Sequence, residues 1–308
     1  MSDINLFRLK PEVKPIELHA VRLEKEIQTL IERNMETFFG VRFLASEYTI
    51  AQTSGADVQG GRIDSLGIDE NMCPVIFEYK RDANENVINQ GLFYLDWLID
   101  HQADFKLLVM EKLGTGEAEA IDWSGPTVYC IANAFGKYDL HAIKQMNRNI
   151  RLIRYANGGD VLMFEYLNSP STCGSSVGSA SSAPAASGSK GSTDKTYAEK
   201  YEGTTEALRE IVDEVRRYMG SLGNDVSENV LKQYLAIKKA RNVVCVEVNK
   251  TRVILHLRLD PDTVELSDIV MDAREKGHWG TGDLECSLHT MDELERVKPL
   301  LERAYLEN

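Results

Sequence analysis

Short apolar runs, separated by turn-forming residues, follow one another through the first half of the chain. Residues 63–68 and 75–79 are two such runs, with a glycine pair before the first and an Asp-Glu-Asn stretch after it. Runs of this length predict neighbouring strands of a hairpin. Because alternate side chains of a strand share a face, we expect Glu78 and Lys80 to project together, with the aromatic residues beside them on the opposite face.

Apolar residues recur at helical spacing in several longer segments. Residues 23–39 carry a stripe centred near Ile27 and Phe38 and end at a glycine, which predicts an amphipathic helix. Glu24 falls at the edge of this stripe, whereas Glu26 points away from it. Further helices are predicted over residues 87–98, 103–113, 138–146, 204–219, 226–240 and 291–305.

Other segments have the composition of strands. Residues 127–132 form a continuous apolar run, which is typical of a strand buried on both faces. Residues 150–155 and 161–167 are separated by an Asn-Gly-Gly turn, and residues 41–50 supply another strand before a polar loop at 52–59. An extended lead-in is expected over residues 1–18. Strands that alternate with helices in this way predict an α/β sheet flanked by helices.

A segment rich in Ser, Gly and Ala at residues 168–193 interrupts this pattern. It has no apolar periodicity, which predicts a flexible linker. We therefore expect a first domain at residues 1–167 and a smaller α+β domain at residues 194–308. Besides its helices, the second domain has strands predicted over residues 243–248, 252–259 and 284–288 and a glycine-punctuated loop at 277–283.

The predicted hairpin in the first domain brings together side chains that suit a metal site. Asp64 lies in its first strand, and Glu78 and Lys80 lie in its second. Two adjacent carboxylates repel each other unless a cation lies between them, and a hard divalent ion with oxygen ligands resolves this repulsion. A lysine beside metal-bound water favours attack on a phosphodiester.

These residues resemble the signature of the PD-(D/E)XK nuclease superfamily. Asp64 is followed, after 13 residues, by Glu78-Tyr79-Lys80, although Ile63 stands where the superfamily often has proline. The resemblance implies a restriction-endonuclease-like mixed sheet and an endonuclease that hydrolyses DNA with Mg²⁺ or Mn²⁺. It also implies that Glu24 completes the metal site and that Gln90 holds a phosphate or the attacking water. A role in restriction or DNA repair, and a homodimer that cuts both strands, are further expectations.

Other interpretations of the same residues remain open. The hairpin charges, Glu24 and Gln90 are equally consistent with solvated surface positions. A nuclease-like fold that does not cleave is the competing function: it would bind nucleic acid, RNA included, or act as an interaction protein through its second domain. Retention of Asp64, Glu78 and Lys80 together argues against a retired active site.

The net charge limits which ligands the chain is expected to bind. The formal net charge is −13, which is unfavourable for tight non-specific binding to a duplex because phosphate contacts supply much of the affinity. The densest basic cluster of the first domain contains Arg148, Arg151 and Arg154, which either face a nucleic-acid backbone or solvate a strand edge.

The five cysteines are scattered without C-x-x-C spacing, which indicates a reducing compartment and no structural zinc. With no apolar run of membrane length and no leader peptide, the expectation is a cytoplasmic protein without membrane association.

The second half resembles a small domain of unknown function that is found alone or fused to predicted nucleases and is sometimes labelled a predicted transport protein. The resemblance depends on residues 252–259, the Gly-His-Trp-Gly-Thr-Gly stretch at 277–282 and a terminal Ala-Tyr pair. It supplies no established chemistry. We expect a binding face that contains His256, Arg258, His278 and Trp279, with the tryptophan as a stacking platform for a base or peptide. The alternative is that Trp279 packs to fix the turn.

Overall fold

The computed structural model describes residues 5–19, 23–50, 60–80, 86–146, 148–168, 195–223 and 225–308, and it divides into two compact units, residues 1–170 and 171–308. The predicted polar loop at residues 52–59 lies outside the described residues. So do residues 169–193 of the predicted linker. Asn168, by contrast, belongs to the first unit, since its side chain accepts a hydrogen bond from the Leu152 amide and donates one to the Ile150 carbonyl.

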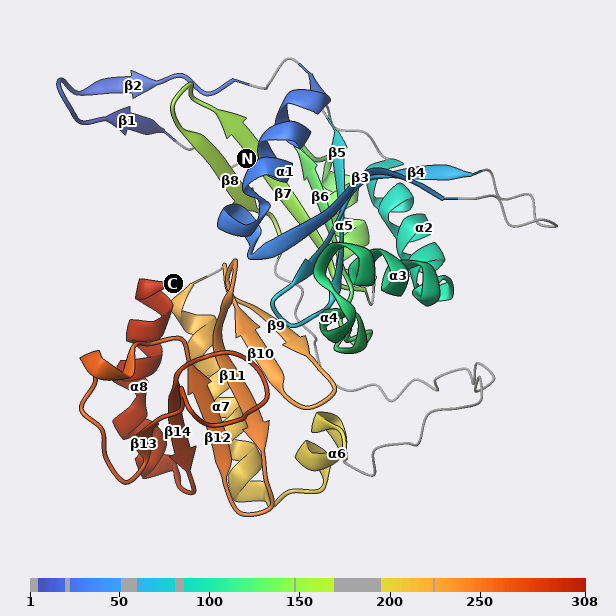
Figure 1. Cartoon of the computed structure of the whole chain (residues 1–308). Helices are drawn as coiled ribbons and strands as arrows, with labels where there is room; N and C mark the ends of the chain where they lie inside the picture. The colour runs from blue at the N-terminus through green and yellow to red at the C-terminus, as the bar shows by residue number, and fades with distance from the viewer. Residues whose placement is uncertain are drawn as a thin grey trace. The chain divides into compact units, whose positions relative to one another are not determined.

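A mixed six-stranded sheet forms the centre of the first unit (Figure 1). Its strands lie in the order β3-β4-β5-β6-β7-β8, with parallel pairing of β5, β6 and β7 and antiparallel pairing elsewhere. The sheet therefore has the α/β character that the alternation of segments predicts. The strands are β3 (Val41–Ile50), β4 (Gly61–Asp69), β5 (Pro74–Lys80), β6 (Thr127–Ala132), β7 (Ile150–Asn157) and β8 (Leu162–Tyr166).

Helices cover both faces of this sheet (Figure 1). One face packs against α1 through an aromatic-rich cluster that includes Phe39, Phe77 and Tyr129. The other face packs against α2, α3 and α5 through an aliphatic cluster. Every residue of β6 is buried, as its continuous apolar run predicts. The helices are α1 (Glu24–Phe39), α2 (Asn86–Asp100), α3 (Gln102–Leu113), α4 (Thr115–Glu119) and α5 (Lys137–Ile143).

Two details of the first unit differ from the expectation. The N-terminal lead-in contains a two-stranded hairpin of β1 (Leu6–Arg8) and β2 (Lys14–Ile16). In α1, Leu30 is 40% exposed, whereas Gln28 is buried. The buried stripe of the helix therefore includes a polar residue that the apolar pattern left out.

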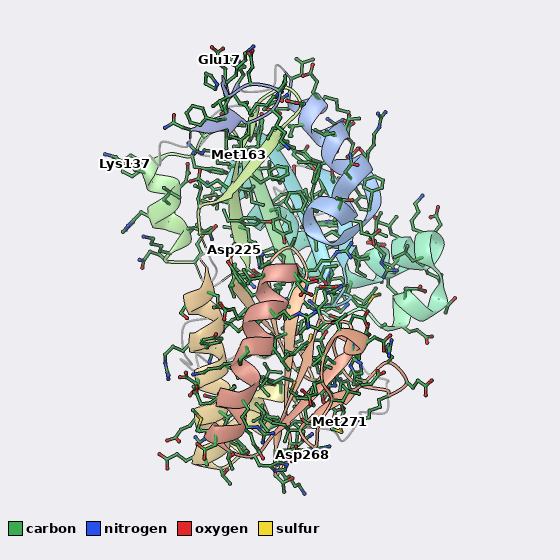
Figure 2. The ribbon with its side chains drawn as sticks, turned by 90° about the vertical axis from the view of Figure 1, so that its left-hand side faces the viewer. Glu17, Lys137, Met163, Asp225, Asp268 and Met271 are labelled. Atoms are coloured by element: carbon green, nitrogen blue, oxygen red, sulfur yellow. The ribbon has the colours of Figure 1, made fainter. Side chains whose placement is uncertain are left out.

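The second unit has its own six-stranded sheet, in the order β13-β14-β12-β11-β10-β9, with every pairing antiparallel. Its two long helices, α7 and α8, lie side by side (Figure 2) and bury the Val and Leu side chains of one sheet face. Lys298 of α8 contacts Glu214 of α7 at 2.8 Å. The elements are α6 (Tyr197–Glu202), α7 (Glu206–Leu222), β9 (Ser227–Val230), β10 (Leu235–Lys238), β11 (Asn242–Val248), β12 (Val253–Leu257), η1 (Pro261–Thr263), β13 (Val270–Asp272), β14 (Leu284–Leu288) and α8 (Met291–Glu307).

The helix predicted over residues 226–240 is wrong. The segment forms β9 and β10, joined by a tight turn in which the Leu231 amide donates to the Tyr234 carbonyl. Pairing of β10 with β11, for example Leu235 opposite Val246, fixes the segment as strand. Among the described residues, no helix is long and apolar enough to cross a bilayer.

Candidate functional site

The candidate site of the first unit lies where β4 and β5 separate. Their paired residues run from Ile68 opposite Pro74 to Ser65 opposite Phe77, and β4 then continues in pairing with β3 alone. At the point of separation, the Asp64 carboxylate takes the place of a backbone acceptor, since the Tyr79 amide donates to its Oδ2 at 3.0 Å. The sheet thus directs a charged side chain between two strands without leaving that amide unpaired.

Glu78 lies beside Asp64 and is only 1% exposed. The Asp64 amide donates to Glu78 Oε1 at 3.3 Å. Burial, and secondly the negative charge of Asp64, raise the pKa of Glu78 to about 9, although the Asp64 amide and Lys80 favour its ionised form. In the absence of a cation, Glu78 is therefore a neutral carboxylic acid at pH 7.

Asp64 also has a raised pKa, chiefly because it is buried. The Tyr79 amide, Lys80 and Arg62 act in the opposite direction, whereas the charge of Glu24 raises the pKa further. Glu24 and Lys80 are thus close enough to Asp64 to interact with it electrostatically. The structure therefore brings Asp64 and Glu78 into contact, with Lys80 and Glu24 around them.

Helix α1 is fastened to the site by residues that the sequence pattern did not identify. Gln28, one turn after Glu24, donates from Nε2 to the Asp64 carbonyl at 2.9 Å and to Glu32 Oε1 at 2.9 Å. Glu32 in turn accepts from the Ser65 hydroxyl at 2.7 Å. The signal that could have found them is a polar line at positions 24, 28 and 32, because residues four apart lie on one helix face.

Helix α2 approaches the same sheet face as Glu78. Gly91 allows this approach, because a Cβ there would lie 2.7 Å from Val128 and 3.7 Å from Cys130, the residue in register with Glu78. The neighbouring Gln90 has a buried Oε1 for which no described residue provides a hydrogen bond. One turn later, the Tyr94 hydroxyl accepts from the Arg62 amide at 3.3 Å. The position of Gln90 thus leaves its carbonyl available to a group that is not part of the protein.

The arginine cluster does not form one exposed surface. Arg151 is 3% exposed and lies under the rings of Tyr129 and Tyr166. Arg154 is largely buried and pairs with Glu165 at 2.6 Å. Of the three, Arg148 alone is well exposed, and it contacts Asp96 at 3.4 Å. The expectation that these arginines together face a nucleic-acid backbone is therefore wrong for Arg151, which is buried, and stays a prediction for Arg148 and Arg154.

In the second unit, the sheet face opposite the two long helices carries polar side chains. Cross-strand register places Glu285 of β14 opposite His256 of β12, and Glu247 lies on the neighbouring β11. The His256 ring is 1% exposed, with Nδ1 at 3.4 Å from Glu247 and Nε2 at 3.9 Å from Glu285. The His278 ring stacks on it, with a centroid distance of 4.0 Å. His256 is therefore an internal residue of this face and not part of an exposed surface.

Arg258 has a different role from the one expected. Its Nε donates to the Asn242 carbonyl at 2.8 Å and its Nη2 to the Thr281 hydroxyl at 3.3 Å. Arg258 thus holds the loop that carries Trp279, while Trp279 itself is 53% exposed. Of the four residues predicted for the binding face, Trp279 is exposed, His278 is half-buried and His256 is buried.

Comparison with known proteins supports the division of the chain but identifies no activity. Residues 194–308 match a family described as a domain of unknown function, DUF5655. The match confirms the expected domain of unknown function at the C-terminal end of the chain. The whole chain is similar to an uncharacterized protein of Haemophilus influenzae, with 27% identity over 305 residues, covering 96% of this chain and 97% of that protein.

Two solved structures are similar to about half of the chain at low identity. One is a repair endonuclease from Pyrococcus abyssi (14% identity, TM-score 0.27), and the other is a complex of EndoMS with double-stranded DNA (17% identity, TM-score 0.25). Each match covers 49% of this chain, and it spans 61% and 59% of those chains respectively. Similarity this distant does not indicate a function for this chain.

The chemistry of the first site follows from its donor set. Carboxylate oxygens are the ligands that Mg²⁺ prefers, and this ion is commonly held by one or two carboxylates together with water and substrate phosphates. The contact between Asp64 and Glu78 fits such an ion, because a cation would replace the proton that their proximity retains. In the described part of the chain, no three His, Cys, Asp or Glu side chains are grouped as a complete metal site. Glu24, at the start of α1, interacts with Asp64 electrostatically.

Proposed function

We propose that the first unit is a metal-dependent nuclease that hydrolyses phosphodiester bonds of DNA. The observation that carries this proposal is the contact of the buried carboxyl group of Glu78 with the half-buried carboxyl group of Asp64 at the point where β4 and β5 separate. The resemblance of Asp64, Glu78 and Lys80 to a nuclease signature supports it. A buried acidic pair contributes little to stability by itself, whereas such pairs are frequent at sites that act on substrates.

Each residue has a distinct part in the proposed reaction. Asp64 and Glu78 hold Mg²⁺ or Mn²⁺, and Glu24 contributes a further carboxylate from the start of α1. When bound, the ion supplies a coordinated water of lowered pKa and offsets negative charge on the phosphate. Lys80 orients the attacking water, whose oxygen bonds to phosphorus as the bond to the leaving oxygen breaks and whose proton passes to solvent. The Lys80 ammonium also stabilises the negative charge that develops on the phosphate oxygens.

Gln90 has a positioning part in this reaction. Its buried carbonyl oxygen, which no described residue satisfies, accepts a hydrogen bond from the attacking water. The water is thereby held between Lys80 and the scissile phosphate. The proposed reaction requires no basic surface beyond Lys80 at the site itself. It is therefore compatible with a chain whose net charge is −13.

The decisive experiment is cleavage of labelled duplex, single-stranded and branched DNA, and of RNA, in Mg²⁺ or Mn²⁺. We expect Lys80→Met to lower the cleavage rate on the order of 10²- to 10⁴-fold, because the cation that orients the attacking water and stabilises the developing negative charge is lost. Lys112→Met is the matched control, since Lys112 is a surface residue of α3 in the same unit. Circular dichroism then verifies that both variants are folded.

The outcome also separates nuclease from binding module. Cleavage that persists unchanged in Lys80→Met means that the site is misassigned. Metal-independent binding of nucleic acid by the wild-type protein, with no cleavage under any condition, favours a non-cleaving nucleic-acid-binding protein instead. Faster cleavage of RNA than of DNA reassigns the substrate while leaving the site intact.

A further inference from the structure

The polar face of the second unit contains a cavity of about 530 Å³ that the proposed nuclease reaction does not use. Its lining includes Glu247, Arg252, His256, His278, Trp279 and Glu285. These residues come from three adjacent strands and from the loop at 277–283. The helices of the unit take no part in the lining, because they pack on the opposite sheet face. Paired strands therefore form much of the cavity wall.

The hydrogen-bonding groups of this cavity are unbalanced. Both ring nitrogens of His256 are buried, and the described residues provide no hydrogen bond to either. Glu247 Oε1 accepts from the Trp279 amide at 3.2 Å, and Glu285 Oε2, beside the imidazole, accepts from Lys276 Nζ at 3.3 Å, so the second oxygen of Glu247 and the His256 nitrogens are the groups left for a ligand. Carboxylates only accept hydrogen bonds, and a neutral imidazole has a single donor. A ligand that presents adjacent N–H groups would therefore satisfy what the protein leaves unpaired.

Trp279 is held in place without being buried. Gly280 and Gly282 have positive φ angles of 80° and 127°. A Cβ on Gly280 would lie 2.7 Å from Cys245, and one on Gly282 would lie 2.8 Å from the Leu257 backbone. The loop is therefore pressed against β11 and β12 and fixed there by glycine, while the indole stays 53% exposed. The indole on this constrained loop therefore offers an exposed aromatic face for stacking.

A second cavity, of about 470 Å³, adjoins the first at Trp279 and has the opposite charge. Lys195, Lys200 and Lys250 line it, with Glu199 as the one acidic residue of its lining. Glu199 already accepts hydrogen bonds from the Thr196 amide and hydroxyl. The lysines therefore present net positive charge to an anion. Trp279 separates a cavity that contains two carboxylates, His256 and Arg252 from a cavity that contains three lysines.

We propose that the second unit binds a nucleotide, with its base in the cavity of Glu247, His256 and Glu285, stacked on Trp279, and its phosphate on Lys195, Lys200 and Lys250. The base is guanine by preference, because two adjacent N–H groups of its pairing edge match one carboxylate. Adenine, cytosine and thymine lack that pair of donors. Stacking on an aromatic side chain supports any base, so the carboxylate provides the selectivity. This proposal is independent of DNA cleavage by the first unit.

Two other ligands fit less well. A metal ion needs the lone pairs of several ligands to converge, but the His256 and His278 rings are stacked within 13° of parallel, so their nitrogens point outward in separate planes. A peptide amine would satisfy the carboxylates, yet it would leave the lysines of the adjoining cavity without an anion. A nucleotide accounts for both cavities and for the indole between them.

The test uses the full-length protein in EDTA, so that cleavage does not interfere. Isothermal titration calorimetry compares dGMP with dAMP, dCMP and dTMP, and also with guanosine, inorganic phosphate and the trinucleotide dTpGpT. We expect dGMP to bind about fivefold or more tightly than the other mononucleotides. A tighter dTpGpT complex assigns the base to a nucleic-acid strand, whereas a tighter dGMP complex assigns it to a free nucleotide.

Substitutions locate the bound base. We expect Glu247→Gln and Trp279→Ala each to weaken dGMP binding about tenfold or more, with Trp279→Phe retaining part of the affinity because it can still stack. Lys250→Met should weaken dGMP binding and leave guanosine binding unaltered. The matched controls are Glu275→Gln and Leu266→Ala, two exposed positions of the same unit that line neither cavity.

Three results would overturn the proposal. The first is the absence of binding by every nucleotide and by the trinucleotide. The second is dGMP affinity that is unchanged in both Glu247→Gln and Trp279→Ala, with circular dichroism showing intact folds. The third is equal loss of guanosine and dGMP binding in Lys250→Met, because the lysines would then not hold the phosphate. None of these results bears on cleavage by the first unit.

Discussion

The two units each bury a pair of acidic side chains on a β-sheet, but they accommodate the pair differently. In the first unit, Asp64 and Glu78 are in direct contact, and burial together with repulsion raises the pKa of Glu78 to about 9. In the second unit, an imidazole separates Glu247 from Glu285, and burial lowers the pKa of His256 to about 4. One pair thus retains a proton, whereas the other surrounds a neutral ring.

This difference has a chemical consequence. Two carboxylates that share a proton can exchange it for a divalent cation, which gains ligands from both. Two carboxylates that are held apart by a neutral ring cannot converge on one ion, but they can accept hydrogen bonds from a planar ligand. Similar residue types on similar sheets therefore favour catalysis in one unit and recognition in the other.

The comparison also involves the two sheets. Helices cover both faces of the first sheet, so a polar site can form only where strands separate, as β4 and β5 do after Ser65. In the second sheet, helices cover one face, and the loop at 277–283 partly covers the other. Its polar side chains therefore occupy the middle of continuously paired strands, among them His256 opposite Cys245.

The largest expected effect concerns metal binding, which we assign to the first unit and not to the second. We expect Asp64→Asn to abolish the calorimetric heat of Mn²⁺ binding and to lower cleavage on the order of 10²- to 10⁴-fold, because a carboxylate that holds the ion is lost. Glu275→Gln, an exposed position of the second unit, should leave the Mn²⁺ isotherm unchanged. Loss of the isotherm in Glu247→Gln instead would assign the ion to the second unit.

A smaller effect concerns the stability of the metal-free protein. The folded-state pKa of Glu78 is about 9, above its ordinary value of 4.5. Ionisation therefore opposes folding: the penalty is absent below about pH 4.5, grows as the pH rises, and is complete above about pH 9. We expect Glu78→Gln in EDTA to raise the free energy of unfolding at pH 8 by on the order of 5 kcal/mol.

Saturating Mn²⁺ should cancel this gain, because the ion stabilises only a protein that can bind it. Urea unfolding at pH 5 and pH 8, with and without Mn²⁺, measures both quantities. Glu111→Gln, a well-exposed acidic position of α3, controls for loss of charge. Equal stability of Glu78→Gln and wild type at both pH values would show that Glu78 ionises freely.

The corresponding effect in the second unit has the opposite sign. The pKa of His256 is lowered from 6.5 to about 4, first by burial and then by the charges of His278 and Lys276. Its contribution to stability is therefore complete above about pH 6.5 and is lost as the pH falls toward 4. Between pH 7 and pH 5, this loss is about 2 kcal/mol.

Glu247 and Glu285 also face the imidazole, and the pKa of Glu247 is raised by burial. Protonation of Glu247 on acidification therefore partly offsets the effect of His256. The difference between wild type and His256→Asn isolates the imidazole, since Asn does not titrate. Amide hydrogen exchange of β12, corrected for intrinsic rates, should show a smaller loss of protection at pH 5 in His256→Asn. An identical loss in both proteins would contradict the lowered pKa.

The sequence predicted the first site better than the second because the first depends on local order. Asp64, Glu78 and Lys80 lie on two strands that are adjacent along the chain, so alternation along each strand was enough to place them together. The residues that fasten the site were missed, because Gln28 interrupts an apolar stripe and becomes meaningful only beside the Asp64 carbonyl.

The second site combines strands whose adjacency no local pattern reveals. β12 pairs with β14 across about 30 intervening residues, and only this pairing brings Glu285 to His256. The wrong prediction of a helix over residues 226–240 has a similar cause. Two four-residue strands joined by a turn without glycine or proline place apolar residues at spacings that imitate a helix. Burial of Arg151 was likewise decided by the tyrosines of neighbouring strands.

The smallest expected effects concern Gln28 and Arg258, which position the residues of each site. Gln28 touches the backbone carbonyl of Asp64, and Arg258 touches the loop of Trp279; neither reaches the proposed ligands. We expect Gln28→Met to lower cleavage about threefold to tenfold and to raise the Mn²⁺ concentration for half-maximal activity, because one hydrogen bond that orients Asp64 is worth roughly 1 kcal/mol. Arg258→Met should weaken dGMP binding about threefold and leave cleavage unaltered. A loss of cleavage in Gln28→Met without a shift in Mn²⁺ dependence would mean that Gln28 stabilises the helix and not the position of the carboxylate.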